Sequence, residues 1–355
     1  MSIRVFIIDD SAVVRKVLTE MLKAAAGIEV IGSAQDPIFA QSKMEKDWPD
    51  VITLDVEMPR MDGITFLKKI MAERPTPVIM CSTLTEEGSK TSLEALRIGA
   101  IDVVAKPKAN LKTSLPEASH ELVSAIRVAA KANMASVKPK RIAPVLRIPE
   151  KLTADAVLSK KVSRNARLAR PLIAIGSSTG GTQALEEVLT ALPANTLPIL
   201  IVQHMPEKFT RTFADRLNEL CQVNIKEAED NDAVLPGRVL IAPGGKHMML
   251  QTTQFGASVQ VKDGPLVSRH KPSVDVLFRS VSKYAGSNAL GIILTGMGDD
   301  GAKGMKEMHD EGAKTIGQNE ETCVVYGMPQ EAYKLGAVDS EVALDRIPEI
   351  IVAHK

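Results

Sequence analysis

The sequence predicts an α/β protein in which two doubly wound parallel-sheet domains are joined by a linker. Short apolar strands alternate with helical segments in both halves of the chain, a pattern typical of a parallel sheet that helices cover on both faces. Between the halves, bases and prolines replace this periodicity. The length of 355 residues suits two domains and a connector, and a hydrophobic fraction of 45% allows each domain a substantial core.

The first domain is expected over residues 1–134. A helical pattern over 11–26 places Leu18 and Leu22 on one side, and an amphipathic helix over 115–134 closes the domain. Helical segments separate the predicted strands, which are 4–8, 28–33, 51–54, 77–81 and 101–105. Strands separated by helices at this spacing indicate a parallel, doubly wound sheet.

Residues 135–169 are expected to form a basic, flexible linker. The stretch holds nine bases and three prolines but only two acids, Glu150 and Asp155. The prolines interrupt any long helix, and a solvated tether is favoured over a binding patch.

The second domain is expected over residues 170–355. Helical patterns at 182–192 and 210–220 lie among short apolar segments, and polar and apolar residues alternate over 251–261, which indicates a hairpin. The predicted strands are 172–175, 198–202, 239–242 and 290–294. The two halves therefore share an architecture, although they share no motif.

The composition argues against several classes of protein. A net charge of +1 and an aromatic content of 3% disfavour a nucleic-acid binder. Asp9 and Asp10 interrupt the N-terminal apolar run, and no stretch is long and apolar enough to span a bilayer. The three cysteines are widely spaced and lack a paired metal spacing. We therefore expect a cytoplasmic protein with free thiols, no nucleic-acid partner and no direct membrane insertion.

Acids, a hydroxyl and a lysine end four predicted strands of the first domain. Asp9 and Asp10 end the first strand, Asp55 ends the third, Ser82 the fourth and Lys106 the fifth. The carboxyl ends of parallel strands converge on one edge, so these groups are expected to lie together. Two carboxylates ~4 Å apart repel by about 4 kcal/mol at an effective dielectric near 20, which favours a shared Mg²⁺ ion. Helix N-capping explains any one of these acids but not the whole set.

This edge is expected to accept a phosphoryl group. Asp55 acts as the nucleophile and becomes an aspartyl phosphate. Ser82 donates a hydrogen bond to that phosphate, and Lys106 supplies a positive charge. The bond between Lys106 and Pro107 is expected to be cis, which aims the lysine.

Three blocks of the first domain resemble two-component receiver domains. They are I-I-D-D-S at 7–11, L-D-V-E-M-P at 54–59 with M-D-G at 61–63, and A-K-P at 105–107. The resemblance covers residues 1–134 and implies a flavodoxin-like fold. It also implies that Asp9, Asp10 and Asp55 hold the metal and that a partner histidine kinase phosphorylates Asp55.

A glycine-rich turn, G-S-S-T-G-G at 176–181, follows the first predicted strand of the second domain and precedes a helix. Such a turn either cradles a dinucleotide phosphate or, as G-x-S-x-G, exposes Ser178 as a nucleophile. A tight turn with serine caps is a third interpretation. The place of a ribose-binding acid after the next strand holds Gln203 and His204, which disfavours a dinucleotide.

A serine nucleophile needs a base, and the base needs an orienting carboxylate. His204 follows the next strand, and Asp299 and Asp300 lie in a glycine-rich loop after another. These groups are expected at the carboxyl edge of one sheet. Chemistry alone does not choose between the two acids, and His247 and His270 remain alternative bases. The order Ser, His, Asp differs from that of α/β-hydrolases, so the turn does not assign that fold.

The second domain closely resembles the catalytic domain of the chemotaxis methylesterases, the CheB family. The matching blocks are I-G-S-S-T-G-G-T at 175–182, Q-H-M-P at 203–206 with F-T at 209–210, I-A-P-G at 241–244, R-H-K-P-S-V-D at 269–275, L-T-G-M-G-D-D-G at 294–301, and Q-N-E through Y-G-M-P over 318–329. The resemblance implies Ser178 as the nucleophile, His204 as the base and Asp300 as the orienting acid. It also implies the backbone N–H of Met297 as an oxyanion donor, and it implies no cofactor in the esterase site.

The implied activity is hydrolysis of glutamate γ-methyl esters on methyl-accepting chemotaxis receptors, with release of methanol. Deamidation of receptor glutamines is a second implied activity. Ser177 stands where many members have alanine, and Asp299 where some have asparagine. The roles within the pairs Ser177/Ser178 and Asp299/Asp300 therefore need testing. If the receiver occludes the catalytic face until Asp55 is phosphorylated, a chain that starts near residue 170 is more active than the unphosphorylated whole.

Two non-enzymatic classes are rivals to this interpretation. A response regulator whose second half binds DNA or a partner is disfavoured, because no helix-turn-helix signal or domain-wide basic charge is present. A scaffolding domain without catalysis is disfavoured by the intact set Ser178, His204 and Asp300. Titration with a serine-directed fluorophosphonate separates these classes.

Overall fold

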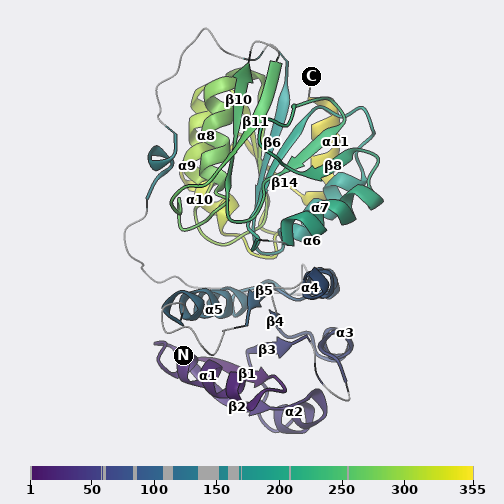
Figure 1. Cartoon of the computed structure of the whole chain (residues 1–355), viewed down its shortest axis with the longest axis vertical. Coiled ribbons are helices and arrows are strands. Elements are labelled where there is room, and N and C mark those ends of the chain that lie inside the picture. The colour runs from purple at the N-terminus through teal and green to yellow at the C-terminus, as the bar shows by residue number, and fades with distance from the viewer. Residues whose placement is uncertain are drawn as a thin grey trace. The chain divides into compact units, whose positions relative to one another are not determined.

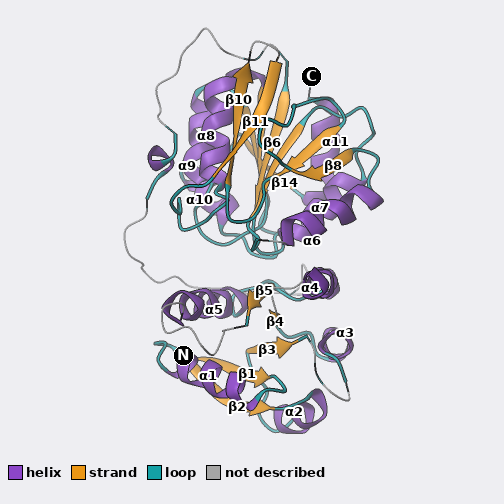
Figure 2. Cartoon of the chain, viewed as in Figure 1, coloured by secondary structure: helices purple, strands orange, loops and turns teal. Residues whose placement is uncertain are grey.

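The computed structural model describes residues 2–56, 58, 61–82, 86–106, 115–134, 152–158, 168, 170–207, 209–253 and 256–354. The chain divides into two compact units, Met1–Ala143 and Pro144–Lys355 (Figure 1). Each unit has its own parallel sheet and its own helices (Figure 2). None of the described helices combines the length and the apolarity needed to cross a bilayer.

The described part of the first unit forms a five-stranded parallel sheet in the order β2-β1-β3-β4-β5. The strands are β1 (Ile3–Ile8), β2 (Ile28–Ala34), β3 (Val51–Asp55), β4 (Val78–Ser82) and β5 (Asp102–Ala105). This is the flavodoxin-like order, in which ligands bind at the carboxyl ends of the strands where the order reverses. The fold predicted for the first half is confirmed.

Helices cover both faces of this sheet. They are α1 (Ala12–Lys23), α2 (Pro37–Met44), α3 (Gly63–Glu73), α4 (Glu86–Ile98) and α5 (Leu115–Ala129). Helices α1 and α5 lie on one face, and α2, α3 and α4 lie on the other (Figure 1). The start of α3 is fixed by Asp62, whose carboxylate accepts from the Thr65 N–H at 2.8 Å. Gly63 allows this helix to approach the end of β3, because a Cβ there would lie 2.0 Å from the Asp55 carbonyl oxygen.

The described part of the second unit forms a seven-stranded parallel sheet in the order β14-β13-β12-β6-β7-β9-β8. The strands are β6 (Leu172–Ser177), β7 (Ile199–Gln203), β8 (Asn224–Glu227), β9 (Arg238–Ile241), β12 (Ala289–Ile293), β13 (Lys314–Gln318) and β14 (Ser340–Val342). The parallel α/β fold predicted here is confirmed. The sequence pattern misses β8, β13 and β14, because their residues are largely polar.

An antiparallel hairpin and several helices complete the second unit. The predicted hairpin is confirmed as β10 (His247–Thr253) paired with β11 (Gly256–Lys262). The helices are α6 (Gly181–Thr190), α7 (Phe209–Leu220), α8 (Val274–Tyr284), α9 (Ala302–Asp310), α10 (Met328–Lys334) and α11 (Ile347–Ala353). Helices α8, α9 and α10 lie on one face of the sheet, and α6, α7 and α11 lie on the other (Figure 1).

Residues 152–158, which we call the clasp segment, dock against the second unit. The segment contains a short 3-10 helix, η1 (Ala154–Ala156). Ala154 is 3% exposed and packs with Met249, Val267 and Val276. The prediction of a flexible linker is therefore corrected for these residues, because they bury apolar side chains. The stretches 135–151 and 159–167 lie outside the described residues, and so does Pro107 with its predicted cis bond.

Candidate functional site

The residues predicted to accept a phosphoryl group lie at one edge of the first sheet. Asp9 follows β1 directly, Asp10 comes next, and Asp55 is the last residue of β3. One oxygen from each of these carboxylates lies within 4.8 Å of the other two. Ser82 ends β4, and its carbonyl oxygen accepts from the Lys106 backbone N–H at 2.9 Å. All five predicted side chains thus come from neighbouring strand ends.

Lys106 forms ion pairs with Asp9 and Asp55, the two buried acids of this edge. Its Nζ lies 2.6 Å from Asp55 Oδ2 and 3.2 Å from Asp9 Oδ2. Burial raises the pKa of Asp9, against the attraction of Lys106. Burial alone lowers the pKa of Lys106, but the hydrogen bond and charge of Asp55 outweigh it and raise that pKa above its ordinary value. A single lysine therefore neutralises part of a site that gathers three carboxylates.

The donor set of this edge fits a hard divalent cation. Mg²⁺ prefers oxygen ligands and is usually bound by one or two carboxylates together with phosphate oxygens. Asp9, Asp10 and Asp55 offer three such oxygens close together. Asp10 is exposed, so one side of the cluster is open to solvent and to a phosphodonor.

The three residues of the predicted triad follow three adjacent strands of the second unit. Strand β6 lies between β12 and β7. Ser177 pairs with Gln203 in the register of β6 and β7, so Ser178 and His204 leave neighbouring strands at the same level. The His204 N–H donates to the Ser177 carbonyl at 3.1 Å, and the Ser178 N–H donates to the Thr295 carbonyl at 3.1 Å. Backbone hydrogen bonds therefore fix the serine against both neighbouring loops.

Asp300 binds His204 through a short hydrogen bond. His204 Nε2 lies 2.8 Å from Asp300 Oδ2. An ionised carboxylate only accepts hydrogen bonds, so Nε2 carries the proton and Nδ1 is left as the basic nitrogen. His204 Nδ1 is buried and has no hydrogen-bond partner among the described residues. The imidazole is thus held in the tautomer that a general base needs.

The protein surrounds Asp300 with further donors. Its carboxylate accepts from Ser273 Oγ at 2.7 Å, from the Val274 N–H at 2.8 Å and from the Asp275 N–H at 3.1 Å. Burial alone raises the pKa of Asp300, but the hydrogen bonds from His204 and Ser273 outweigh burial and bring the pKa down to about 2. The carboxylate therefore stays ionised at any physiological pH.

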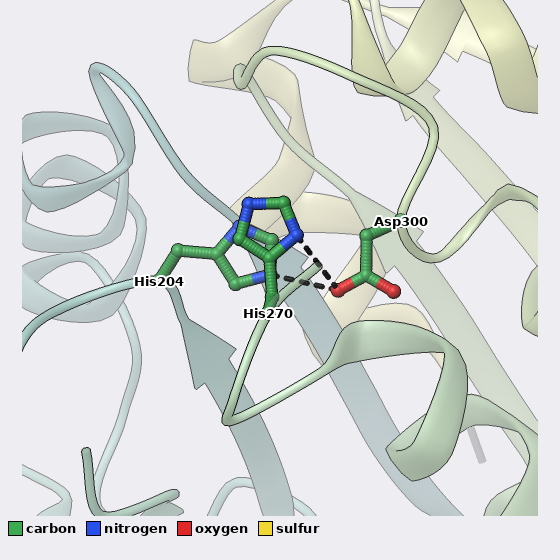
Figure 3. Close-up of side chains that lie close together, drawn as sticks. All are labelled: His204, His270 and Asp300. Carbon is green, nitrogen blue, oxygen red and sulfur yellow. Dashed lines mark hydrogen bonds and ion pairs between the residues drawn. The ribbon is translucent and has the colours of Figure 1, made fainter. Parts of the chain in front are cut away.

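His270 stacks on His204 beside the same acid. The two ring centroids are 3.7 Å apart and the planes differ by 4°. His270 Nδ1 lies 3.9 Å from Asp300 Oδ2, so both imidazoles face the one carboxylate (Figure 3). Nδ1 also lies 2.9 Å from the Ser268 carbonyl oxygen, which is an acceptor, so Nδ1 carries a proton. His270 covers one face of the His204 ring.

Comparison with known proteins identifies the family to which this architecture belongs. Residues 173–351 match the CheB methylesterase family, and residues 5–115 match the response regulator receiver domain family. A protein-glutamate methylesterase/protein-glutamine glutaminase 2 of Chromobacterium violaceum is 60% identical over 354 residues, which are 99% of each chain. A protein of Shewanella oneidensis with the same two activities in its name is 58% identical over 351 residues, again 99% of each chain. This chain belongs to the CheB methylesterase family.

A solved structure supports the same assignment for the second unit. The CheB methylesterase catalytic domain of Thermotoga maritima is similar, with a TM-score of 0.51 and 36% sequence identity. The similarity covers 52% of this chain and 98% of that one. The receiver and methylesterase resemblances read from the motifs are both confirmed.

The remaining candidate residues of this CheB-family chain have different surroundings. His247 is buried on β10, where its Nδ1 accepts from the Ser273 N–H at 3.3 Å and its Nε2 lies 2.9 Å from the Pro265 carbonyl oxygen. Both ring nitrogens are occupied, so His247 is a structural residue rather than a base. Asp299 is only half-buried, whereas its neighbour Asp300 contacts His204. The predicted oxyanion donor, Met297, follows a glycine whose added Cβ would lie 2.7 Å from the Ser178 Cβ.

The sequence does not indicate several residues that hold this CheB site. Gln203 accepts from Ser177 Oγ at 2.7 Å and donates to the carbonyls of Ser178 and His204, each at 3.0 Å. Ser273 lies in the R-H-K-P-S-V-D block, so the family resemblance singles out its segment but not its contact with Asp300. No periodicity or spacing indicates such contacts, because they join segments that are far apart in the chain.

Proposed function

We propose that the second unit is a serine hydrolase acting on glutamate γ-methyl esters of methyl-accepting chemotaxis receptors and on receptor glutamines. Relatives that share 99% of their length with this chain are named for both activities. The observation that carries the mechanism is the hydrogen bond between His204 and Asp300, because it leaves the second imidazole nitrogen free to take a proton.

In the proposed reaction His204 Nδ1 takes the proton from Ser178 as the serine oxygen attacks the ester carbonyl. The carbonyl becomes an oxyanion, which the Met297 backbone N–H stabilises. Such a donor contributes on the order of 3–4 kcal/mol in hydrolases. His204 then returns the proton to the leaving methoxide, and methanol departs. Water attacks the acyl-enzyme and His204 takes its proton. His204 returns that proton to the Ser178 oxygen as the acyl bond breaks, which leaves a glutamate side chain on the receptor. With a glutamine side chain the leaving group is ammonia.

Asp300 orients this base. Its ionised carboxylate stabilises the imidazolium that forms on His204 during each proton transfer. The pKa of Asp300, about 2, keeps the acid charged throughout the working range. Neither step needs a cofactor in the esterase site.

We also propose that the receiver, residues 1–134, controls the esterase, residues 170–355, to which residues 135–169 tether it. A chemotaxis histidine kinase donates a phosphoryl group to Asp55. Asp9, Asp10 and Asp55 hold Mg²⁺, which when bound neutralises charge on the phosphoryl oxygens. Lys106 and the Ser82 hydroxyl contact the phosphoryl group from the fifth and fourth strands. The enzyme works in the cytoplasm, where receptor and kinase meet it.

Release of methanol from a methylated receptor tests the proposal. The full chain is expected to release methanol faster when acetyl phosphate is supplied, and Ser178→Ala is expected to release none above background. Ser177→Ala is the matched control, because many members of the resembling family carry alanine at this position, and it is expected to retain most of the activity. A Ser178→Ala enzyme with wild-type turnover would falsify the proposal. A receptor carrying glutamine in place of the methyl ester is expected to release ammonia.

A further inference from the structure

The clasp segment makes polar contacts with two parts of the second unit that lead to the esterase site. The Leu152 carbonyl oxygen accepts from the Ser268 N–H at 3.0 Å. Arg279 of α8 donates to Asp155 Oδ1 at 2.9 Å and to the Leu158 carbonyl oxygen at 3.1 Å. The Arg279 side chain is only 5% exposed, whereas the Asp155 side chain is 55% exposed, so a buried guanidinium meets a carboxylate at the surface. The segment lies between residues 115 and 173, outside both family matches.

The first contact holds a strained turn. Ser268 and Arg269 are consecutive non-glycine residues in the left-handed region, with φ values of 49° and 70°. Residues in this region carry strain of order 1–3 kcal/mol each and persist only where the surroundings enforce them. The turn is closed by Val267 and His270, whose N–H and carbonyl groups bond reciprocally at 3.1 and 2.9 Å. Val267 is fully buried against Ala154 of the clasp segment.

The same turn carries groups that touch the triad. His270 stacks on His204, and its Nδ1 lies 2.9 Å from the Ser268 carbonyl oxygen. Ser268 Oγ donates to Asp275 Oδ2 at 2.9 Å, and the Asp275 N–H donates to Asp300. One residue, Ser268, therefore connects the clasp segment to both the stacked histidine and the triad acid.

The second contact, with Arg279, is made to helix α8, which begins beside Asp300. Helix α8 starts at Val274, whose N–H donates to Asp300 Oδ2 at 2.8 Å. Arg279 lies five residues further along and also binds Glu307 of α9. The clasp segment and α9 thus both contact α8 through the Arg279 guanidinium.

We infer that the clasp segment is a positioning element of the esterase site, which holds the 267–270 turn and the start of α8 so that His270 and Asp300 keep His204 in its reactive orientation. This inference rests on the proposed esterase function. It assigns a role in the reaction to residues of the tether that touch no substrate.

The test disrupts the packing of the clasp segment within the full chain. Ala154→Glu places a carboxylate in the apolar contact with Met249, Val267 and Val276, and it is expected to lower kcat for methanol release by about ten- to a hundredfold. KM is expected to stay within twofold, because the substrate contacts are unchanged. Ala156→Glu is the matched control, since Ala156 is exposed two residues away, and it is expected to match the wild type.

Hydrogen exchange gives a readout that does not depend on activity. The Ser268 amide donates to the clasp segment, so Ala154→Glu is expected to speed exchange in the peptide spanning 264–275, and Ala156→Glu is not. If both variants show wild-type exchange and wild-type kcat, the inference is overturned. If exchange rises in Ala154→Glu while the wild-type chain releases no methanol from any receptor, the clasp segment does hold the 267–270 turn but the proposed function is wrong.

Asp155→Ala is a second variant for the case in which Ala154→Glu does not fold. Asp155 is half-exposed, so its removal leaves the apolar contact in place and breaks the ion pair with Arg279 and the hydrogen bond from Thr153 Oγ1. A threefold to tenfold fall in kcat is expected at a temperature well below the unfolding transition. An unchanged kcat together with unchanged exchange in α8 contradicts the inference.

Discussion

The two units place their reactive groups at the same kind of sheet edge but stabilise a buried carboxylate in opposite ways. Asp9 is 1% exposed and Asp300 is fully buried. The pKa of Asp9 is raised by burial, whereas the pKa of Asp300 falls to about 2. Asp300 receives hydrogen bonds from His204, Ser273 and two backbone N–H groups, while Asp9 receives one from the Ser11 N–H and contacts Lys106.

This difference indicates how each edge works. Hydrogen bonds to the charged form offset the loss of hydration, so the protein itself keeps the buried Asp300 carboxylate ionised. The receiver edge has gathered three carboxylates with one lysine, so the protein itself neutralises only part of the negative charge there. Burial alone therefore does not indicate the role of an acid at a strand end. The hydrogen-bond donors around its carboxylate indicate that role.

The largest expected effect is confined to the receiver edge and leaves the esterase edge unchanged. Asp55→Asn removes the nucleophile, so the chain is expected to take up no phosphate from acetyl phosphate. Methanol release without a phosphodonor is expected to stay at the wild-type level, and the stimulation by acetyl phosphate is lost. Phosphate incorporation and methanol release measured on one preparation check both statements. Stimulation that survives in Asp55→Asn contradicts the assignment.

The complementary change is Asp300→Asn. An amide keeps the shape but favours the wrong histidine tautomer, and the corresponding change in a serine protease lowers kcat about 10⁴-fold. We expect a loss of this size in methanol release, with phosphate uptake unchanged. Asp299→Asn is the matched control and is expected to cost less than tenfold. If Asp299→Asn is the more damaging variant, the orienting acid has been assigned to the wrong residue.

A smaller effect concerns the acid beside Asp300. Burial and the charge of Asp300 raise the pKa of Asp275 to about 6. A raised pKa means that the folded chain holds the proton more tightly, so this stabilisation is present below about pH 4 and is lost as the pH rises through 6. The loss amounts to roughly 3 kcal/mol at 1.36 kcal/mol per pKa unit.

Asp275→Asn removes this titration. As the pH rises from 4 to 8, the wild type is expected to lose unfolding free energy relative to the variant. Urea unfolding of the second unit, followed at several pH values, measures that difference. A difference that does not vary with pH shows that Asp275 is charged in the folded chain as readily as in the unfolded one.

The smallest expected effect is the pH dependence of Mg²⁺ binding at the receiver edge. The pKa of Asp9 is raised, and a metal ligand must lose its proton before it binds. Affinity for Mg²⁺ is therefore expected to fall as the pH falls towards the pKa of Asp9, by at most about tenfold per pH unit for one proton. Calorimetric titration at several pH values checks this. An affinity that rises on acidification rules out Asp9 as a ligand.

Sequence patterns predict the strand ends well and the contacts between loops poorly. Asp55 and His204 can be located from the sequence because Asp55 ends an apolar strand and His204 directly follows one, and parallel strands end at one edge. Ser273 and Ser268 lie in a loop without periodicity, and their hydrogen bonds to Asp300 and Asp275 join segments that only the tertiary fold brings together. Ala154 lies in a stretch whose charge and prolines indicate a linker, and its burial depends on packing with Met249, Val267 and Val276.

The position of β6 has a consequence for the order in which the enzyme becomes active during synthesis. This strand is the first of the second unit in the chain, yet it lies in the middle of the sheet, between β7 and β12. The ribosome produces nucleophile and base early, but the acid comes 96 residues after His204. Because domains emerge and fold from the N-terminus onwards, a nascent chain carries its finished receiver long before β12 can insert beside β6. The receiver is therefore folded before the catalytic site of the second unit can be completed.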